Sequence, residues 1–483
     1  MVVAVLLGLL TVSGLYLYNE SNQTIKSLAV LPFVNLTADP EQEYFADGVT
    51  DMLIADLAKL RALGVISRTS VMRYKGTRKS LPEIGRELNV DAVVEGSVLR
   101  SDDRIRITAQ LIHAATDRHL WVATYERDVR DILSLQREIS GNIAQEIRIT
   151  LTPQEQARLT SAGQINPAAY EAYLKGRYYW NWRVGEGFNR AIGYFQQAVE
   201  LDPNYALAYV GLADCYNLLA NYDLLPPREA VPKAKAAAKK ALELDGTLAE
   251  AHASLAFARM YYDWDWQGAE SQFQRAIDLN PNYAAVHHWY SLYLAMMGRS
   301  DEAMAEMRRA QELDPLSLII NTNVGWLYYF ARQYDQAIGQ CRKVLEMDAN
   351  FFSARVKLGW TYEQRGMHEQ AIAEFQTVLN VSSDDPALRA MLSRGYALSG
   401  RRDEAVRILH QLGEQSQRSY VSPYLIALVY TGLGEKDQAF DWLEKAYENR
   451  CGWLAWLRVD PKLDSLRSDS RFADLLRRVG LTP

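Results

Sequence analysis

Small and apolar residues recur along the second part of the chain at a constant interval. An alanine opens the pattern A-x-x-x-apolar-x-x-small six times, and the same distance in sequence separates each occurrence from the next. The six residues are Ala269, Ala303, Ala337, Ala371, Ala405 and Ala439. Apolar residues three or four positions apart lie on one face of a helix. Because antiparallel helices approach closely only where a small side chain faces the partner, the pattern predicts a stack of helix pairs.

The interval, from Ala269 to Ala303 and onward, is that of tetratricopeptide repeats (TPRs), in which each unit is a helix pair. The pattern extends back to Ala234 and Ala191, with extra residues in the loop around 225–227. Prolines such as Pro281 close several units, because proline cannot donate a hydrogen bond into a continuing helix. We therefore predict eight TPR units over residues 165–450, forming an all-α superhelical solenoid.

Residues 451–483 contain two further apolar runs that carry charged residues on their other face. The second run has helical spacing at Leu463, Leu466, Phe472, Leu475 and Leu476. A solenoid needs a cover for its terminal repeat. We predict that this segment supplies it as C-terminal capping helices.

Residues 24–150 do not share the repeat, and their pattern is that of an α/β domain. Apolar and polar residues alternate over 104–111, which predicts a strand with one buried and one solvated face. A short turn joins this strand to another over 92–100, as in a hairpin. An Asp-Pro pair at 39–40, followed by acidic residues, marks the start of a helix.

The stretch 2–18 contains no charged residue. As a helix it would reach about 25 Å, close to the thickness of a bilayer core. Tyr16 and Tyr18 stand where an aromatic belt would meet the headgroups. A cleaved signal peptide would require a basic region ahead of the apolar run, so we predict a single-pass transmembrane anchor instead. The abrupt apolar start leaves open that a larger N-terminal portion precedes this chain.

Composition narrows the possible chemistry. The net charge of -6 gives no global excess of cations for phosphates, which argues against nucleic acid as a partner of this chain. The three cysteines lie far apart, without the spacing of a zinc site or a disulfide framework. The common phosphate-binding, zinc and serine-nucleophile motifs do not occur in the sequence. We therefore predict a protein that is not an enzyme and needs no cofactor or metal.

The strongest candidates for a binding site come from the repeat register. The first helix of each pair lines the concave groove of a solenoid. That register places His288, Trp326, Tyr329, Trp360 and Tyr424 toward the groove. Exposed aromatic residues are enriched among interface hot spots, so these residues predict a protein or peptide partner. The alternative is that some of them pack between repeats.

Several strings resemble a known family of bacterial proteins. AVLPFVNLTADPEQEYFADGVTDML, VISRTSVMRYKG and IGRELNVDAVVEGSVLR are similar to the TolB amino-terminal-like domain of large signalling proteins. GRYYWNW, LLPPREA, YDWDW, NPNYAAVHHWY and LRVDPKLDSLRSD resemble the TPR region of the same proteins. In that family the output module is a class III nucleotide cyclase, a CadC-like winged-helix domain or a serine/threonine kinase. This sequence contains none of these modules.

The resemblance implies a non-catalytic, membrane-anchored scaffold or sensory module of a bacterial signalling system. It also implies an inner-membrane location with the folded bulk in the periplasm. Two alternatives remain open from the sequence. One is the C-terminal regulatory part of a cyclase, kinase or winged-helix regulator whose output domain is missing from this chain. The other is a soluble periplasmic assembly factor.

Overall fold

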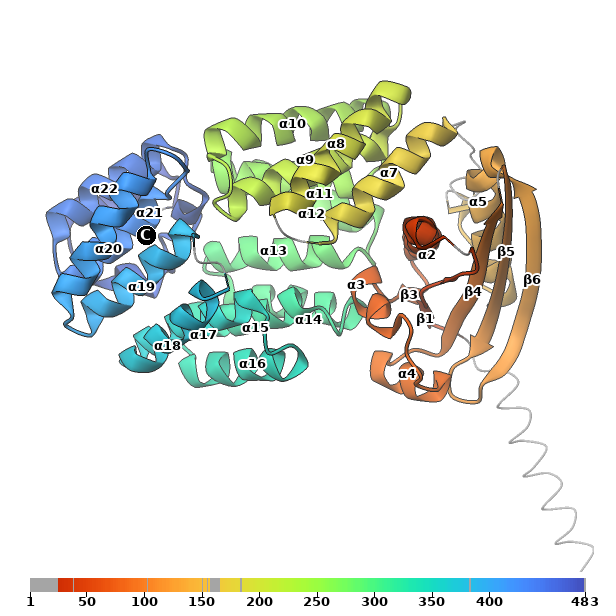
Figure 1. Cartoon of the computed structure of the whole chain (residues 1–483), viewed down its shortest axis with the longest axis horizontal. Helices are drawn as coiled ribbons and strands as arrows, with labels where there is room; N and C mark the ends of the chain where they lie inside the picture. Colours follow the sequence, from red (N-terminus) through yellow and green to blue (C-terminus); the bar gives the residue numbers. More distant parts are fainter. Residues whose placement is uncertain are drawn as a thin grey trace, which may run out of the picture.

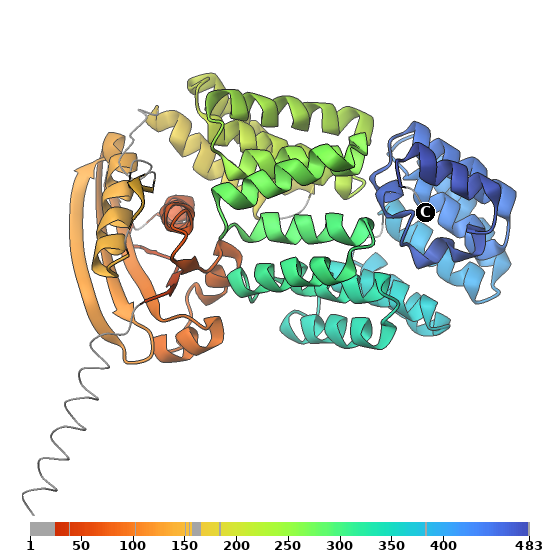
Figure 2. The ribbon, with the colours of Figure 1, turned by 180° about the vertical axis from the view of Figure 1, so that it is seen from behind.

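The computed structural model describes residues 25–481, apart from 38, 102, 150, 154, 157–165, 183–184 and 382–383. An α/β domain comes first and a long array of helices follows it (Figure 1). The same arrangement seen from behind shows the sheet at one end of the molecule (Figure 2). In both views the helices of the α/β domain lie between its sheet and the solenoid.

The sheet has the strand order β3-β1-β4-β5-β6, with β2 paired to β4. Its strands are β1 (Ser27–Val30), β2 (Val34–Asn35), β3 (Gly64–Val65), β4 (Ala92–Ser101), β5 (Arg104–His113) and β6 (Arg118–Asp128). β1 lies parallel to β3 and β4, whereas β4, β5 and β6 form an antiparallel meander. The predicted hairpin is confirmed, because β4 and β5 pair from Ser101 opposite Arg104.

One face of this sheet is covered by helices and the other is solvated. The helices of the domain are α2 (Glu43–Ala58), α3 (Arg68–Val71), α4 (Leu81–Leu88) and α5 (Ile132–Glu146). Ile105 and Ile107 of β5 are fully buried, whereas Arg104 and Arg106 beside them are exposed. The alternation read from the sequence therefore separates the two faces of the sheet.

Eight antiparallel helix pairs follow in the described part of the chain. They are α7 (Pro167–Trp180) with α8 (Gly185–Leu201), α9 (Ala206–Asn221) with α10 (Pro227–Leu244), α11 (Ala249–Ala258) with α12 (Trp266–Leu279), α13 (Ala284–Met296) with α14 (Ser300–Leu313), α15 (Leu318–Phe330) with α16 (Tyr334–Met347), α17 (Phe352–Gln364) with α18 (His368–Leu379), α19 (Pro386–Leu398) with α20 (Arg402–Gln415), and α21 (Pro423–Leu433) with α22 (Lys436–Glu448). The prediction of an all-helical solenoid is confirmed for this part of the chain.

The turn between the two helices of a pair is as regular as the helices. A residue with positive φ recurs there once in each of six successive repeats, at Trp264, Gly298, Arg332, Gly366, Gly400 and Gly434. Glycine adopts this left-handed conformation without a steric penalty and commonly ends helices in this way. The register read from the alanines is therefore also the register of the folded backbone.

Glycines on the first helices allow the second helices to approach closely. A Cβ atom at Gly359 would lie 2.5 Å from the ring of Phe375. One repeat earlier, a Cβ at Gly325 would lie 3.2 Å from Sγ of Cys341. Cys341 is buried in the place that Phe375 occupies in the next repeat. The two positions thus differ mainly in the size of the facing side chain.

We expect Gly359→Ala to lower the free energy of unfolding by about 1 to 3 kcal/mol, since the added methyl overpacks against the Phe375 ring. Gly325→Ala is the matched control and should cost less, because its neighbour is the smaller Cys341. Both variants gain the higher helix propensity of alanine, so that contribution cancels in the comparison. Urea unfolding followed by circular dichroism measures both losses, and equal losses would contradict this account of the packing.

Asn282 fixes the α/β domain to the solenoid. Its Nδ2 donates to the backbone carbonyls of Ala58, Leu60 and Leu63, at 3.1, 3.1 and 2.9 Å. Nη2 of Arg309 donates to its Oδ1 at 2.9 Å. The loop after α2 is therefore held by the loop before α13, although the two loops are far apart in the sequence.

A second buried contact joins α3 to the end of α14. Oγ of Ser70 donates to Oδ1 of Asp314 at 2.5 Å and accepts from the backbone N–H of Leu316 at 2.8 Å. Burial raises the pKa of Asp314 to about 6, and hydrogen bonds from Ser70, Ser67 and Thr69 partly offset this effect. This buried carboxyl therefore lies where its neutral form is favoured.

The raised pKa of Asp314 should make the stability of the folded chain depend on pH. Because its pKa is higher in the folded chain than the ordinary value of 3.8, the folded chain binds the proton more tightly. The stabilisation is full below pH 4 and is lost as the pH rises through about 6. Asp314→Asn removes this dependence. Relative to wild type, the variant should gain about 1 kcal/mol of unfolding free energy between pH 5 and pH 7.5, measured by urea unfolding. A difference that does not vary with pH would contradict the assignment.

The membrane part of the predicted fold class is corrected here. Crossing a bilayer takes about 20 predominantly apolar residues. None of the helices in the described residues meets this requirement; α10, with 18 residues, carries several lysines. The stretch 2–18, where we predicted the anchor, lies outside the described residues. The single-pass transmembrane assignment and the inner-membrane location that depended on it are therefore not upheld.

The described part of the chain ends in two 3-10 helices and one α-helix. These are η5 (Gly452–Trp456), η6 (Pro461–Leu466) and α23 (Ser470–Arg478). Arg478 of α23 pairs with Glu444 of α22 at 2.5 Å, so α23 lies against the last repeat. Nε1 of Trp266 also donates to the carbonyl of Val479 at 2.9 Å, which brings the end of the chain to α12.

Candidate functional site

The five residues predicted to line the groove all lie on first helices. His288 belongs to α13, Trp326 and Tyr329 to α15, Trp360 to α17 and Tyr424 to α21. All five are buried, with exposed fractions between 0% and 7%. What covers the four aromatic residues is the segment Cys451–Arg467, which contains η5 and η6 and which we call the tail segment.

The four aromatic residues form one cluster with the tryptophans of the tail segment. The rings of Trp326 and Tyr329 stack at 4.5 Å, and Trp326 contacts Trp360 at 5.3 Å. Trp453 stacks on Tyr424 at 5.9 Å and meets Trp360 edge-on at 5.5 Å. Such offset and edge-on pairs each stabilise the packing by about 0.5 to 1.5 kcal/mol beyond area burial. The tail segment is therefore seated on the first helices through its indole rings.

Lys462 of the tail segment places its ammonium group among these rings. Its Nζ lies 4.3 Å from the ring centre of Trp360, 5.2 Å from that of Trp326 and 5.4 Å from that of Tyr329. We call these three rings the aromatic cage. A cation over aromatic faces is attracted by their quadrupoles, most strongly where water is excluded. The side chain of Lys462 is fully buried, and burial lowers its pKa.

The aspartate two residues earlier supplies the counter-charge of this lysine. Oδ2 of Asp460 lies 3.0 Å from Nζ of Lys462, and the side chain of Asp460 is 1% exposed. The hydroxyl of Tyr424 donates to the same carboxylate. The predicted groove residues thus contact both members of the buried Asp460–Lys462 pair. Trp326, Tyr329 and Trp360 surround the ammonium group, and Tyr424 donates to the carboxylate.

A second buried ion pair lies beside the cage on the repeats themselves. Nε of Arg394 on α19 lies 3.2 Å from Oε2 of Glu363 on α17, and the two side chains are 5% and 0% exposed. Burial raises the pKa of Glu363 to about 7, while the positive charges of Arg394 and Lys462 act in the opposite direction. The Glu363 carboxylate therefore depends on nearby cations to stay charged.

His288 belongs to a polar row that runs along three successive first helices. Its Nε2 lies 2.5 Å from Nδ2 of Asn323, and Lys357 donates to Oδ1 of the same asparagine. Lys357 also lies over the ring of Trp326, at 5.4 Å. Burial lowers the pKa of Lys357 to about 7. The row links His288 to the aromatic cluster.

The sequence did not reveal the polar residues of this region, namely the buried Asn323, Glu363 and Arg394 and the half-buried Lys357. A signal for two of them was present in the register. Arg394 lies one repeat after Trp360, and Glu363 lies one repeat after Tyr329, so both occupy positions already assigned to the groove. In the sequence alone, a polar residue at such a position cannot be told from a solvent-exposed one, because its ion-pair or hydrogen-bond partner is not visible there.

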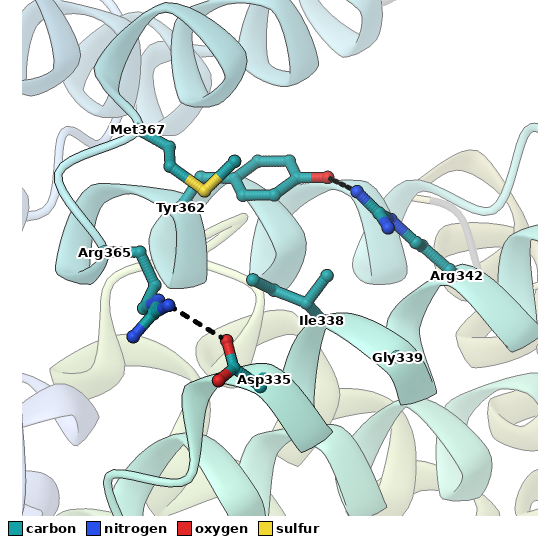
Figure 3. A pocket seen from close by; sticks show the side chains of 7 residues that line it. All are labelled: Asp335, Ile338, Gly339, Arg342, Tyr362, Arg365 and Met367. Atoms are coloured by element: carbon teal, nitrogen blue, oxygen red, sulfur yellow. Dashed lines mark hydrogen bonds and ion pairs between the residues drawn. The ribbon is translucent and has the colours of Figure 1, made fainter.

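A depression of about 330 Å³ lies between α16 and the end of α17 (Figure 3). One hydrogen bond and one ion pair cross it. Arg342 donates to the hydroxyl of Tyr362 at 3.0 Å, and Arg365 pairs with Asp335 at 3.3 Å. Figure 3 shows both pairs spanning the hollow, with Ile338 between them. The lining thus combines the apolar Ile338 and Met367 with arginines whose guanidinium groups are already engaged in these contacts.

Metal-ligating and cysteine side chains do not form a further site in the part of the chain that the structure describes. Within those residues, no group of three or more His, Cys, Asp or Glu side chains is placed to hold a metal ion. The three cysteines are buried free thiols. Burial raises the pKa of Cys341 and of Cys451 to about 12, so neither is a ready nucleophile at neutral pH.

Comparison with known families assigns both parts of the chain. TPR family models match residues 265–317, 331–395, 363–429 and 424–450. The model of the HilA/YgeH-like transcriptional regulator second domain matches residues 23–142. The chain carries TPR repeats and a HilA-like regulator domain. For the latter we had expected a TolB amino-terminal-like domain, which the comparisons do not show.

Two curated relatives extend this assignment. A protein named putative adenylate cyclase 3, from Rhizobium meliloti, is 36% identical over 242 residues, which cover 48% of this chain and 40% of that protein. The transcriptional regulator HilA of Salmonella typhimurium is 27% identical over 158 residues, covering 33% of this chain and 28% of that protein. The matched regions therefore span less than half of either relative.

Among solved structures, the human IFIT1 dimer with m7Gppp-AAAA is 16% identical to this chain. The alignment covers 65% of this chain and 77% of that one, with a TM-score of 0.46. The score reflects a limited superposition of the two molecules.

Proposed function

We propose that this chain is a protein-binding regulatory module of a bacterial signalling protein, and that the first helices of its TPRs hold the partner. One observation carries the proposal. The face formed by α15, α17 and α21 already holds a polypeptide segment, because Trp453 and Lys462 of the tail segment are seated among its side chains. A surface that packs around tryptophan and lysine side chains has the chemistry needed to bind a protein partner.

The relatives support a regulatory role. One is named a putative adenylate cyclase and the other a transcriptional regulator, so similar sequence accompanies two different outputs. A module that occurs both in a protein named a cyclase and in a transcriptional regulator is suited to sensing or docking, and not to nucleotide cyclisation or DNA binding itself. Within this proposal the HilA-like domain and the TPRs act as one unit, because Asn282 and Asp314 fix them together.

Site-specific photocrosslinking tests the proposal. A benzoylphenylalanine replaces Phe352, which is 42% exposed at the start of the first helix α17. The matched control replaces Val381, which is 85% exposed and follows the second helix α18. After irradiation in cells, adducts with a defined set of proteins should form at Phe352 and not at Val381. A folded chain that forms no protein adduct at Phe352 would contradict the proposal.

A second candidate is participation in cyclic nucleotide formation, which the relative named putative adenylate cyclase 3 favours. This candidate predicts that the purified chain converts ATP into cyclic AMP when Mg²⁺ or Mn²⁺ is supplied. Mass spectrometry of the product separates the two candidates. Cyclic AMP formation by the chain alone would replace the regulatory assignment, whereas protein adducts without cyclic AMP would support it.

A further inference from the structure

The tail segment differs in character from the repeats that it covers. Between its ends its backbone hydrogen bonds are local, as from Leu457 N to Leu454 O at 3.2 Å and from Asp460 N to Trp456 O at 2.9 Å, and at its start Cys451 N donates to the carbonyl of Ala446 in α22 at 2.9 Å. Its contacts with the first helices are made by side chains, such as Trp456 stacked on Phe330 at 4.2 Å. A segment held in this way resembles a bound peptide more than another layer of the solenoid.

The aromatic cage surrounds an ammonium group with ring faces. Its three rings present faces to the charge from α15 and α17, and Asp460 completes the site at 3.0 Å. A neutral side chain of similar length would fill the space but would lose the attraction between cation and rings. It would also leave Asp460 buried without its counter-charge, which is unfavourable in a dry site.

Each of the two buried ion pairs of this region is contained within one part of the chain, either the tail segment or the repeats. Asp460 and Lys462 neutralise each other and belong to the same segment. Glu363 and Arg394 neutralise each other and both belong to the repeats. When the tail segment leaves, one neutral pair departs and one neutral pair remains. An incoming segment that brings its own aspartate and lysine restores the same balance.

We propose that the aromatic cage of Trp326, Tyr329 and Trp360 is a binding site for a lysine side chain of a partner polypeptide, and that Lys462 of the tail segment competes for it within the chain. The proposal rests on the proposed function, because it names the chemistry of the partner that the TPRs hold. The recognised element is a lysine two residues after an aspartate, with a tryptophan upstream, as in the tail segment itself. Release of the tail segment is then the step that opens the site.

Peptide binding to the full chain tests the proposal. The probe is a fluorescent peptide with the sequence of residues 451–467, and its matched control carries Nε-acetyl-lysine at the position of Lys462. The chain is used as wild type, as Lys462→Met and as Lys436→Met, which alters an exposed lysine at the start of α22. Lys462→Met weakens the internal competitor without removing the rings of the cage.

We expect Lys462→Met to bind the lysine peptide about tenfold more tightly than wild type or Lys436→Met does, by fluorescence anisotropy. Acetylation of the lysine in the peptide should lower its affinity for Lys462→Met about tenfold. Equal affinity for the two peptides, or no gain from Lys462→Met in a folded chain, would overturn the proposal. If protein adducts still form at Phe352 in that case, the proposed function stands and only the lysine site falls.

Amide hydrogen exchange of the wild-type chain provides a measurement that needs no variant. A displaceable tail segment opens without global unfolding, so its amides between 454 and 463 should exchange about tenfold faster than those in the centres of α15 and α17. Excess lysine peptide should speed this exchange further by capturing the open cage. Exchange as slow as in the central helices, with or without peptide, would show that the tail segment is permanent core and would overturn the proposal.

Discussion

Arg394→Met should lower the free energy of unfolding by about 3 to 5 kcal/mol at pH 8, because it leaves the Glu363 carboxylate buried without its partner. The pair lies between α17 and α19, and the side chain of Glu363 is fully buried. The loss should shrink at lower pH. Since burial already raises the pKa of Glu363 to about 7, protonation becomes the easier way to neutralise this group once Arg394 is gone.

The matched control for this prediction is Arg401→Met in the same repeat. Arg401 pairs with Glu369 at 2.5 Å, but the two side chains are 40% and 66% exposed. A surface pair of this kind contributes between zero and about 1 kcal/mol. Urea unfolding of both variants at pH 6 and pH 8 makes the comparison. Similar losses for Arg394→Met and Arg401→Met, or a loss that does not depend on pH, would contradict the assignment of a buried pair.

Asn282→Leu should cost about 3 kcal/mol and weaken the attachment of the HilA-like domain to the TPRs. The variant removes the donor shared by the carbonyls of Ala58, Leu60 and Leu63 and takes from Arg309 one of its two acceptors, the other being Glu312. Each buried polar group left without a partner costs about 1 to 3 kcal/mol, and partial rearrangement keeps the total near the lower end of the sum.

Asn350→Leu is the control, since Asn350 lies two repeats later at the same position and is exposed. Thermal unfolding and limited proteolysis of both variants report the result. We expect earlier unfolding and faster cleavage of the loop after α2 only in Asn282→Leu. Equal behaviour of the two variants would show that the side chain of Asn282 does not hold the domains together.

The repeat part of the fold could be predicted from the sequence because its determinants are local and periodic. Alanine and glycine recur once per repeat and identify the helices, and each helix packs against its neighbour in the sequence. The hairpin of β4 and β5 was likewise visible, because its strands are adjacent in the sequence and alternate between buried and exposed residues. The contact of Asn282 with the loop after α2 was not visible, since nothing local marks a partner so distant in the sequence.

The candidate site was predicted only in part, for a similar reason. The register identified Trp326, Tyr329, Trp360 and Tyr424 as residues facing one surface, and the structure brings all four together. The register could not reveal that the tail segment covers these four residues. An apolar pattern such as that of the tail segment indicates burial but not the surface against which burial occurs. We predicted a terminal cap, and α23 does lie against α22, whereas η5 and η6 reach back across the first helices.

The membrane prediction depended on a single apolar stretch and on a family resemblance, without support from packing. Its correction changes the proposed setting of the molecule but not the chemistry of the first-helix face. The aromatic cage, the Asp460–Lys462 pair and the Glu363–Arg394 pair all lie within the described residues.

The TPRs bind a lysine-bearing segment of polypeptide in this account, and the NMR signals of Lys462 test this binding directly. Carbon–proton correlation spectra of the full chain labelled with ¹³C-lysine resolve the methylene protons beside each ammonium. We predict that one such signal lies far upfield of the rest, because the ring faces of Trp326, Tyr329 and Trp360 shield it, and that it disappears in Lys462→Met. A wild-type spectrum in which all lysine signals lie together at their ordinary position would contradict the account.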